Sequence, residues 1–417
     1  MPIYQEKQLL EISQQFQIYG DILHAEACKI GHINETYTAS YNQGGKLIRY
    51  IHQKVNQRVF TDPVAVMENV VRVTSHLRRR LLAEGANDIT RRALVVVPTR
   101  DNQSFYRDGA GEYWRTFVFV ERAATFEAVQ SPQQAFEAGK AFGRFQHLLV
   151  DLPGKRLFET IPYFHHTRRR FDALQQAVEA DEHNRAQSAA AEIGFALHHE
   201  KIVDVLLNAL KRREIPERIA HNDTKFNNVM LDWETGEALC VVDLDTVMPG
   251  LVLYDFGDMV RTTTSTTLED ELDLSQVRMQ MPMFEALARG YLSTASAFLT
   301  PAEKAYLVFS GKLITFTIGL RFLTDYLTGD HYFRVHRPGH NLDRCRTQFK
   351  LVQSITDQEE AMQRLVDRIG DDEGEPVSIL VKPVPRRRPV PAPGGRAKGV
   401  RPPRRSSARS RRPRARR

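Results

Sequence analysis

Cysteine is scarce in this sequence: its three copies, Cys28, Cys240 and Cys345, are far apart in the chain. Such spacing provides neither a disulfide framework nor a Cys-x-x-Cys metal site, so a reducing, cytoplasmic setting is expected. The first residues lack the basic and then apolar order of a signal peptide. No stretch approaches 18 uninterrupted apolar residues, so we expect neither a membrane span nor a membrane partner.

Acidic residues are absent from the last part of the chain. Residues 377–417 contain 15 Lys or Arg and no Asp or Glu, whereas the rest of the chain has 43 basic against 51 acidic residues. The formal net charge of +7 therefore comes from this segment and does not indicate that the folded body binds nucleic acid. We predict that residues 377–417, rich in Pro and Arg, form a disordered basic tail whose partner the sequence does not identify. A frameshifted terminus is the alternative interpretation.

Glycine-rich phosphate loops of the kind used by actin-like and ribokinase-like kinases are also lacking, which disfavours those folds. With 417 residues the chain is long enough for two lobes. Strand-like segments dominate residues 1–120, and helical periodicity dominates residues 121–376. We therefore expect an α+β fold with these two segments as its lobes.

The N-terminal segment contains clear start and turn signals. Residues 42–45, Asn-Gln-Gly-Gly, form a hairpin turn signal between strands expected over 36–40 and 46–55. A helix is expected to start at Asp62-Pro63, because proline is favoured in the first helical turn. Apolar residues at helical spacing predict the buried face of this helix; they are Val66, Val70, Val73 and Leu77.

Three residues of this segment are candidates for holding a nucleotide. Gly31 lets the backbone approach a phosphate closely, although an ordinary hairpin turn is an equally good interpretation. Glu68 lies early on the expected helix and fits the kinase small-lobe glutamate that pairs with a strand lysine, here Lys54. Two alternatives stay open: Arg49 in place of Lys54, and a solvated Glu68 that complements the helix dipole.

The strongest chemical signal lies in residues 219–261. Asp223 is followed five residues later by Asn228, and Asp243 follows the apolar run 238–242. Phosphoryl transfer needs a carboxylate that orients and deprotonates an acceptor hydroxyl, and oxygen ligands that hold Mg²⁺ against the nucleotide phosphates. The spacing is that of a kinase catalytic loop and its metal-binding strand, and it predicts kinase chemistry. The weaker interpretation is an ordinary loop rich in Asp and Asn.

The later part of the chain is predicted to be mostly helical, and one helix over 302–326 carries polar groups among apolar ones. Arg321 and Asp325 are four residues apart, a spacing that allows an internal salt bridge. Arg321 and Tyr326 can alternatively form part of a sugar-binding wall. The residues themselves leave both interpretations open.

Five motifs resemble those of the N-acetylhexosamine 1-kinases, within the protein-kinase-like superfamily of aminoglycoside phosphotransferases and choline kinases. The longest are His-Asn-Asp-Thr-Lys-Phe-Asn-Asn at 221–228 and Cys-Val-Val-Asp-Leu-Asp-Thr-Val-Met-Pro-Gly at 240–250, and the others lie at 31–34, 60–70 and 319–330. The resemblance implies a two-lobed fold with a small β-rich nucleotide-binding lobe and a larger, mostly helical catalytic and substrate lobe. It also implies ATP and Mg²⁺ as cofactors and transfer of the γ-phosphoryl group to the anomeric hydroxyl of GlcNAc or GalNAc.

Carried over residue by residue, the resemblance implies a role for several side chains. Asp223 would be the catalytic base, Asn228 and Asp243 would hold Mg²⁺, and Asp255 would brace the catalytic loop. Asp255-Phe256-Gly257 looks like the protein-kinase metal motif, but it lies 27 residues past Asn228, so we assign the metal role to Asp243. The implied sugar contacts are His32, Asp245, Arg321 and Tyr326.

Two kinds of alternative remain at this point. Within the same fold, the acceptor can be an aminoglycoside, choline, homoserine or another sugar, since no motif specifies a 2-acetamido group. A nucleotide-binding scaffold without turnover is the other alternative, although a scaffold of this type usually lacks one of the three residues Asp223, Asn228 and Asp243. We expect a monomer whose partners are ATP and a small-molecule sugar.

Overall fold

The structure, a computed structural model, describes residues 6–28 and 33–371. Residues 1–375 form one compact unit, and the description below concerns this unit. Gly31, His32 and the tail at 377–417 lie outside the described residues. The predictions of a phosphate-binding glycine, of one sugar contact and of a disordered tail therefore concern residues that the structure does not describe.

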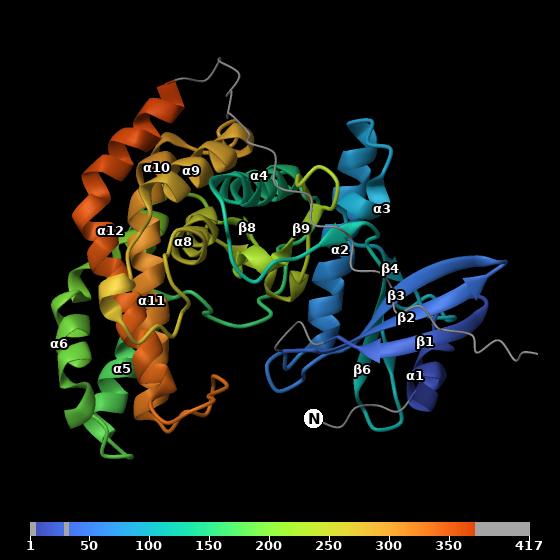
Figure 1. Cartoon of the computed structure of the whole chain (residues 1–417), viewed down its shortest axis with the longest axis horizontal. Coiled ribbons are helices and arrows are strands. Elements are labelled where there is room, and N and C mark those ends of the chain that lie inside the picture. Colours follow the sequence, from blue (N-terminus) through green and yellow to red (C-terminus); the bar gives the residue numbers. More distant parts are fainter. Residues whose placement is uncertain (1–5, 29–32, 372–417) are drawn as a thin grey trace, which may run out of the picture. The chain divides into compact units, whose positions relative to one another are not determined.

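A small antiparallel sheet forms the N-terminal lobe, the N-lobe (Figure 1). Its strand order is β1-β2-β3-β6-β4, and β5 pairs with β6. The elements of this region are α1 (Glu6–Ser13), β1 (Asp21–Ala27), β2 (Glu35–Gln43), β3 (Lys46–Lys54), α2 (Pro63–Ala83), α3 (Ile89–Arg92), β4 (Val96–Val97), β5 (Tyr106–Arg107) and β6 (Tyr113–Val118).

The turn and start signals of the sequence are confirmed in this lobe. β2 and β3 pair from Glu35 with Lys54 to Gln43 with Lys46, and the turn glycines Gly44 and Gly45 have φ values of +61° and +83°. Two successive positive φ values suit a tight hairpin, and glycine adopts them without a steric cost. Helix α2 starts at Pro63, and the Asp62 side chain accepts the Ala65 N–H at 3.0 Å as its N-cap. The four apolar residues expected to face inward on α2 are all buried.

The C-terminal lobe, the C-lobe, is larger and mostly helical (Figure 1). Two small sheets, β10-β9-β7 and β11-β8, lie among its helices. Its elements are β7 (Ala123–Ala124), α4 (Pro132–Leu149), α5 (Thr167–Ala180), η1 (Gln187–Ala189), α6 (Ala190–His198), η2 (Glu200–Ile202), α7 (Val205–Lys211), β8 (Arg218–Ala220), η3 (Phe226–Asn228), β9 (Val229–Asp232), β10 (Ala238–Val241), η4 (Leu244–Thr246), β11 (Met248–Gly250), α8 (Val252–Thr263), η5 (Leu274–Gln276), α9 (Met281–Ala295), α10 (Pro301–Ala305), α11 (Leu307–Leu327) and α12 (His340–Asp371).

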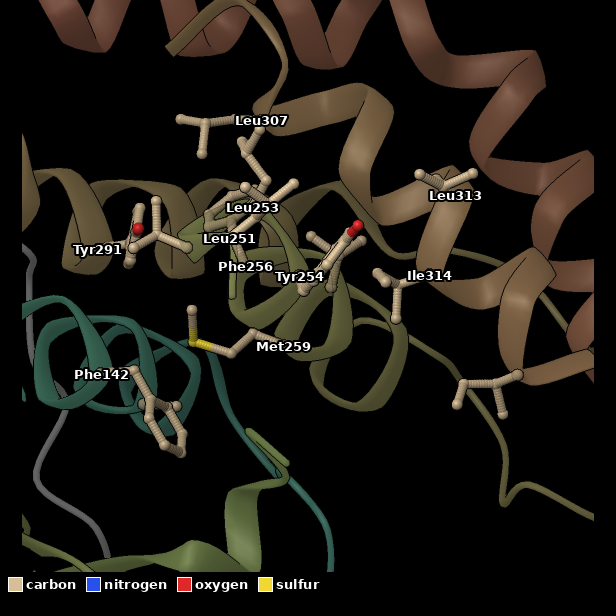
Figure 2. Close-up of a cluster of buried hydrophobic side chains, with 14 of the residues drawn as sticks. Phe142, Leu251, Leu253, Tyr254, Phe256, Met259, Tyr291, Leu307, Leu313 and Ile314 are labelled. Carbon is tan, nitrogen blue, oxygen red and sulfur yellow. The ribbon is translucent and has the colours of Figure 1, made fainter. Parts of the chain in front are cut away.

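Helix α8 is the buried centre of the C-lobe. Figure 2 shows side chains of α8, among them Phe256 and Met259, within a cluster that also contains Phe142 of α4, Tyr291 of α9 and Ile314 of α11. A side chain on Gly257 would place its Cβ 2.4 Å from the carbonyl oxygen of a residue on α11, so only glycine fits there. This close contact fixes α8 against α11 and therefore fixes the direction in which the polar side chains of α8 point.

Helix α11 is long and apolar enough to cross a membrane by length and composition, but 83% of its most apolar window is buried within the fold. It packs against α5, α8 and α12. Such burial is typical of a core helix in a globular protein. The three cysteines are free, as expected from their spacing, and Cys240 and Cys345 are buried.

Candidate active site

The segment between β8 and η3 is a loop held from behind by one carboxylate of α8. The two oxygens of Asp255 accept the backbone N–H groups of His221 at 2.8 Å and Asn222 at 2.7 Å, and Oδ2 also accepts Gln146 Nε2 at 2.7 Å. Burial raises the pKa of Asp255, although His221 and the hydrogen-bond donors act in the opposite direction. Asn222 has a φ of +65°, a left-handed conformation that asparagine tolerates better than most residues. The loop is thus anchored to α8, the buried central helix of the lobe.

Asp223, Lys225 and Asn228 form the polar end of this loop. Lys225 Nζ lies 3.0 Å from Asp223 Oδ1, and Asn228 Nδ2 donates to Asp223 Oδ2 at 3.1 Å and to the Asp223 carbonyl at 2.8 Å. Burial acts to raise the pKa of Asp223, but Lys225, His221 and Arg261 outweigh it, and the pKa lies below its ordinary value. The carboxylate is therefore ionised at neutral pH while its side chain stays 19% exposed.

Asp243 follows β10 and is the accessible residue of an otherwise buried turn. It has a φ of +59°, and the next three residues, which form η4, are buried. Partial burial and the carboxylates of Asp245 and Asp223 raise the pKa of Asp243 to about 7. An accessible carboxylate with this excess of negative charge around it is a favourable position for a cation.

The donors present fit Mg²⁺, which prefers oxygen ligands from one or two carboxylates together with substrate phosphates. The amide nitrogen of Asn228 is directed to Asp223, and within the described part of the chain its Oδ1 accepts no hydrogen bond, which leaves that oxygen available for a cation. Among the described residues no group of three or more His, Cys, Asp or Glu side chains could hold a metal by itself. The nucleotide phosphates would therefore complete the coordination of an ion held by Asp243 and Asn228.

Asp245, expected to contact the sugar, is placed differently by the structure. Its side chain is 2% exposed, both of its oxygens contact the guanidinium of Arg115, and Asn34 Nδ2 donates to Oδ2 at 2.7 Å. The carboxylate thus faces protein donors and has no open side, which corrects the expectation of a substrate contact. Arg115, the cation that pairs with Asp245, lies 130 positions earlier in the chain.

Lys54 does not have the partner expected from the sequence. Its ammonium lies 2.8 Å from Glu35 and 3.9 Å from Glu112, and Glu68 is exposed on α2 and forms no ion pair with any described residue. The physical reason is the register of the hairpin, in which Glu35 lies directly opposite Lys54. Arg49, the other candidate, pairs instead with Glu121, where its Nε lies 3.0 Å from the carboxylate.

The salt bridge between Arg321 and Asp325 is not formed. The Asp325 carboxylate accepts the backbone N–H groups of His331, Tyr332 and Phe333 at 2.8–3.0 Å, and it holds the chain after α11 in place. Backbone donors fixed in three successive residues surround this carboxylate more completely than one mobile guanidinium could.

The Arg321 guanidinium lies among aromatic rings instead. Its centre is 4.9 Å from the ring of Phe164 and 5.4 Å from the rings of Tyr332 and Phe333, and Nη2 donates to the Tyr332 hydroxyl at 3.1 Å. Tyr326 contacts a different region, because its hydroxyl lies 2.9 Å from Ser188 Oγ and Arg185 lies over its ring. The two residues thus have separate surroundings.

Three residues with contacts at the site were not singled out from the sequence. Lys225 is two positions after Asp223, and this spacing was a usable signal. Arg115 occupies the middle of an apolar strand, where a fully buried arginine requires a partner. His165 is buried and its Nε2 lies 2.8 Å from the Asn222 carbonyl, while burial lowers its pKa to about 4, so the ring is neutral. No local pattern distinguishes this histidine from its neighbour.

The site is defined by its side chains, and two surface recesses in the described part of the chain lie elsewhere. One recess, of about 230 Å³, lies behind the loop and is lined by residues such as Gln146, Arg156 and Pro249. The other, of about 220 Å³, lies beside α2 and β4. Neither is lined by Asp223, Asn228 or Asp243.

Comparisons with known proteins give a family match and a set of structures with a similar fold. Residues 24–291 match the model of the phosphotransferase enzyme family, APH. Similar solved structures include a choline kinase from Cryptosporidium parvum, with 12% identity, a TM-score of 0.55, and 88% of this chain and 100% of that chain covered. An aminoglycoside phosphotransferase from Alicyclobacillus acidocaldarius has 12% identity and a TM-score of 0.54, with 89% and 96% covered. A microcompartment-associated aminopropanol kinase has 14% identity and a TM-score of 0.51, with 86% and 98% covered.

At identities of 12–14%, TM-scores of 0.51–0.55 over most of each chain show a shared fold and nothing finer. The prediction of a protein-kinase-like α+β fold, with a small sheet lobe and a larger helical lobe, is therefore confirmed. The loop from Asp223 to Asn228 and the turn at Asp243 both lie within the matched residues.

Proposed function

Because this chain belongs to the phosphotransferase enzyme family, we propose that it is an ATP-dependent kinase that phosphorylates an alcohol group of a small molecule. The observation that carries the proposal is the loop in which Lys225 and Asn228 both contact the ionised Asp223 carboxylate. A carboxylate that is held in place and still accessible can receive the proton of an acceptor hydroxyl. The exposed Asp243 supplies a second carboxylate for the phosphate side of the reaction.

In the proposed mechanism Asp223 accepts a hydrogen bond from the acceptor hydroxyl. As the oxygen of the acceptor bonds to the γ-phosphorus, the bond from that phosphorus to the bridging oxygen of ADP breaks, and the proton of the hydroxyl passes to Asp223. Lys225 keeps Asp223 ionised and offsets negative charge on the transferred group. Asp255 holds the loop through the backbone of His221 and Asn222, so the base stays fixed during the transfer.

Asp243 and Asn228 are the proposed magnesium ligands. When bound, Mg²⁺ offsets the charge on the β- and γ-phosphates and orients them for in-line transfer. Asp243 would contribute its carboxylate and Asn228 its Oδ1.

The nucleotide side of the site is proposed to include Gly31 and Lys54. Glu35 is better placed than Glu68 to hold the ammonium of Lys54, because the two residues face each other across the β2–β3 hairpin. We therefore transfer to Glu35 the pairing role first proposed for Glu68.

The acceptor we propose is an N-acetylhexosamine, GlcNAc or GalNAc, phosphorylated at the anomeric hydroxyl. The support comes from the resemblance of the motifs at 221–228, 240–250 and 319–330, together with the polar and aromatic surroundings of Arg321. His32 and Arg321 are the proposed sugar contacts, whereas Tyr326, which the resemblance also implies, lies in a separate region beside Ser188 and Arg185. Burial lowers the pKa of Arg170 to about 10, and the positive charge of the nearby Arg321 guanidinium adds to this shift. Two guanidinium groups disfavour a cationic acceptor such as choline or an aminoglycoside.

The test is coupled ATP turnover with Mg²⁺ against GlcNAc, GalNAc, glucose, galactose, choline, homoserine and kanamycin. We expect turnover with the two N-acetylhexosamines and a sugar 1-phosphate as the product, identified by ³¹P NMR. Turnover with choline or kanamycin alone would keep the kinase proposal and refute the sugar acceptor. ATP binding without turnover of any acceptor would favour the nucleotide-binding scaffold.

Asp223→Asn separates catalysis from folding in the same assay. We expect kcat to fall by about 10²–10⁴, the range for general acid–base groups, with an unchanged unfolding midpoint. Asp101→Asn is the matched control, because Asp101 is exposed in the loop after β4. Near-wild-type turnover of Asp223→Asn would refute the proposed base.

A further inference from the structure

The carboxylate of Asp245 contacts Arg115 and Asn34, and Arg115 in turn contacts Gln53. We call these four residues, Asn34, Gln53, Arg115 and Asp245, the interlobe cluster. Nη1 and Nη2 of Arg115 contact Oδ1 and Oδ2 of Asp245, and the Nη2–Oδ2 distance is 3.0 Å. Asn34 Nδ2 donates to the same Oδ2 at 2.7 Å. The side chains of Arg115 and Asp245 are each 2% exposed, so the ion pair is closed to water.

Three members of the interlobe cluster belong to the N-lobe and are fixed there. Arg115 Nε donates to Gln53 Oε1 on the neighbouring strand at 3.0 Å, and Asn34 Oδ1 accepts the Asn56 N–H at 2.9 Å. Asp245 belongs to η4 of the C-lobe. The cluster therefore connects the N-lobe sheet directly to the turn that follows Asp243.

A contribution to stability is a weak explanation for such an ion pair. The free energy lost by removing both charges from water is about as large as the free energy gained from their attraction. Apolar side chains of similar volume therefore usually give the same stability. The distinctive property of a bidentate pair is its dependence on geometry, since both nitrogens must reach both oxygens. The pair therefore favours one arrangement of the two lobes over neighbouring arrangements.

The geometry of Asp245 is closely linked to that of Asp243. The two residues are separated only by Leu244, and η4 is a single turn of 3-10 helix. Asp243 has a φ of +59°, and a residue with a side chain keeps such a conformation only where its surroundings hold it. Leu244 and Asp245 are buried and supply this hold. Because Asp245 lies within η4 and Asp243 immediately precedes it, a displacement of the Asp245 carboxylate would shift Asp243 as well.

We propose that Arg115 and Asn34 are positioning residues, which act through Asp245 to place the Asp243 carboxylate for a magnesium–nucleotide complex. The proposal rests on the kinase function proposed above. In this arrangement the N-lobe sheet has a second role besides nucleotide binding. Its contact with the C-lobe determines the position of the Asp243 carboxylate, the candidate metal ligand. Substitutions in the interlobe cluster therefore weaken magnesium-dependent nucleotide binding beyond any loss of stability.

The test compares Arg115→Met with Arg91→Met as the matched control. Arg91 also joins the two lobes, since its Nη2 donates to Asp232 at 2.7 Å, but Asp232 lies at the end of β9 remote from Asn228. Calorimetry measures the Kd of ADP with Mg²⁺ and with EDTA, and this readout needs no acceptor. We expect the Kd with Mg²⁺ to rise about 10–100-fold in Arg115→Met, the range for residues that orient a metal ligand. Arg91→Met should stay within about threefold of wild type, and Arg115→Lys should recover part of the loss.

Hydrogen exchange gives a second readout at the turn itself. The Val247 N–H bonds to the Leu244 carbonyl at 3.1 Å, so its exchange reports whether η4 is formed. We expect faster exchange of this amide in Arg115→Met and unchanged exchange in Arg91→Met. If Arg115→Met does not fold, Asn34→Ala removes the hydrogen bond to Asp245 and the acceptor of the Asn56 N–H, and leaves the ion pair in place. It should shift both readouts in the same direction, by a smaller amount.

The outcomes separate this proposal from the function on which it rests. If wild type binds magnesium ADP and Arg115→Met matches Arg91→Met in Kd and in Val247 exchange, the positioning role is refuted and the kinase proposal stands. If wild type binds no nucleotide with Mg²⁺, the proposed function itself fails. In that case unchanged Val247 exchange in Arg115→Met would refute the coupling between Arg115 and η4 as well.

Discussion

Asp245 and Asp255 are buried carboxylates near the same loop, but their partners differ in kind and in origin. Asp255 accepts two backbone N–H groups and the Gln146 amide, all from the C-lobe. Asp245 accepts a guanidinium and an amide, both from the N-lobe. The first carboxylate can hold the loop whatever the N-lobe does, whereas the second is satisfied only when the N-lobe is in place.

This difference separates two functions of buried charge. Dipoles from the same lobe make Asp255 a permanent support of the loop at 221–228, because movement of the N-lobe does not remove them. A cation from the other lobe makes Asp245 conditional, since its loss leaves a charge buried without compensation. The predictions below test the two carboxylates against each other.

The largest effect is expected from Asp255→Ala. The buried N–H groups of His221 and Asn222 lose their acceptor, and each unsatisfied group costs about 1–3 kcal/mol. We expect the free energy of unfolding to fall by about 3–5 kcal/mol and kcat to fall by about 10² or more, because the loop is displaced. Denaturant unfolding and ATP turnover measure the two changes. A loss of stability below about 1 kcal/mol would contradict the support role.

Double-mutant cycles should show that only one of the two carboxylates is coupled to the N-lobe. Arg115→Met combined with Asp245→Asn should give a coupling energy of about 1–3 kcal/mol in denaturant unfolding, because the two side chains are in contact. Arg115→Met combined with Asp255→Asn should be additive within about 0.5 kcal/mol. Equal coupling in both cycles would remove the distinction between the two sites.

A smaller effect is expected from Gln146→Leu. The substitution removes one donor to Asp255 and the acceptor of the Tyr291 hydroxyl, which lies 2.7 Å from Gln146 Oε1. Two backbone donors to Asp255 remain, so we expect a loss of about 1–2 kcal/mol in unfolding free energy and a modest fall in kcat. Tyr291→Phe is the matched control, because it removes only the hydroxyl. A loss in Gln146→Leu as large as that in Asp255→Ala would show that the side-chain donor, and not the backbone, dominates.

The pH dependence of stability tests a third buried group, His52, which is neutral in the folded protein. His52 of β3 lies between the Tyr41 and Thr116 hydroxyls, and burial lowers its pKa to about 4. The unfolded chain takes up the proton near pH 6.5, so stability is full above that pH and is lost as the pH falls from 6.5 toward 4. We expect a contribution of roughly 1–2 kcal/mol to the loss between pH 7 and pH 5. His52→Gln should flatten the pH dependence of unfolding, and an unchanged slope would contradict this prediction.

Local signals in the sequence predicted much of the fold. The glycines at 44 and 45, the Asp62 cap and the apolar stripe of α2 each act within a few residues, and the structure has all three. The loop from Asp223 to Asn228 was found in the same way, because five residues of spacing are enough to bring the two side chains into contact.

Local signals of this kind did not predict the pairings between residues that are distant in the sequence. The sequence offers Glu68 on the next helix as one candidate partner for Lys54, yet the hairpin register places Glu35 opposite Lys54. Arg321, one helical turn before Asp325, is a possible salt-bridge partner in the sequence. The loop after α11 instead folds back and donates three backbone N–H groups to the Asp325 carboxylate. In both cases several partners were compatible with the sequence, and the path of the chain selected one.

The sequence by itself determined which polar side chains the loop brings together, because the residue types and short spacings at 221–228 and 243 are local properties. Only the tertiary structure decided the partners of Asp245 and Asp255, which come from segments up to 211 positions away. The physical reason is that a buried carboxylate needs hydrogen-bond donors, and the folded chain can supply them from any segment that packs beside it. Propensities within a few residues of Asp245 carry no information about a guanidinium on β6.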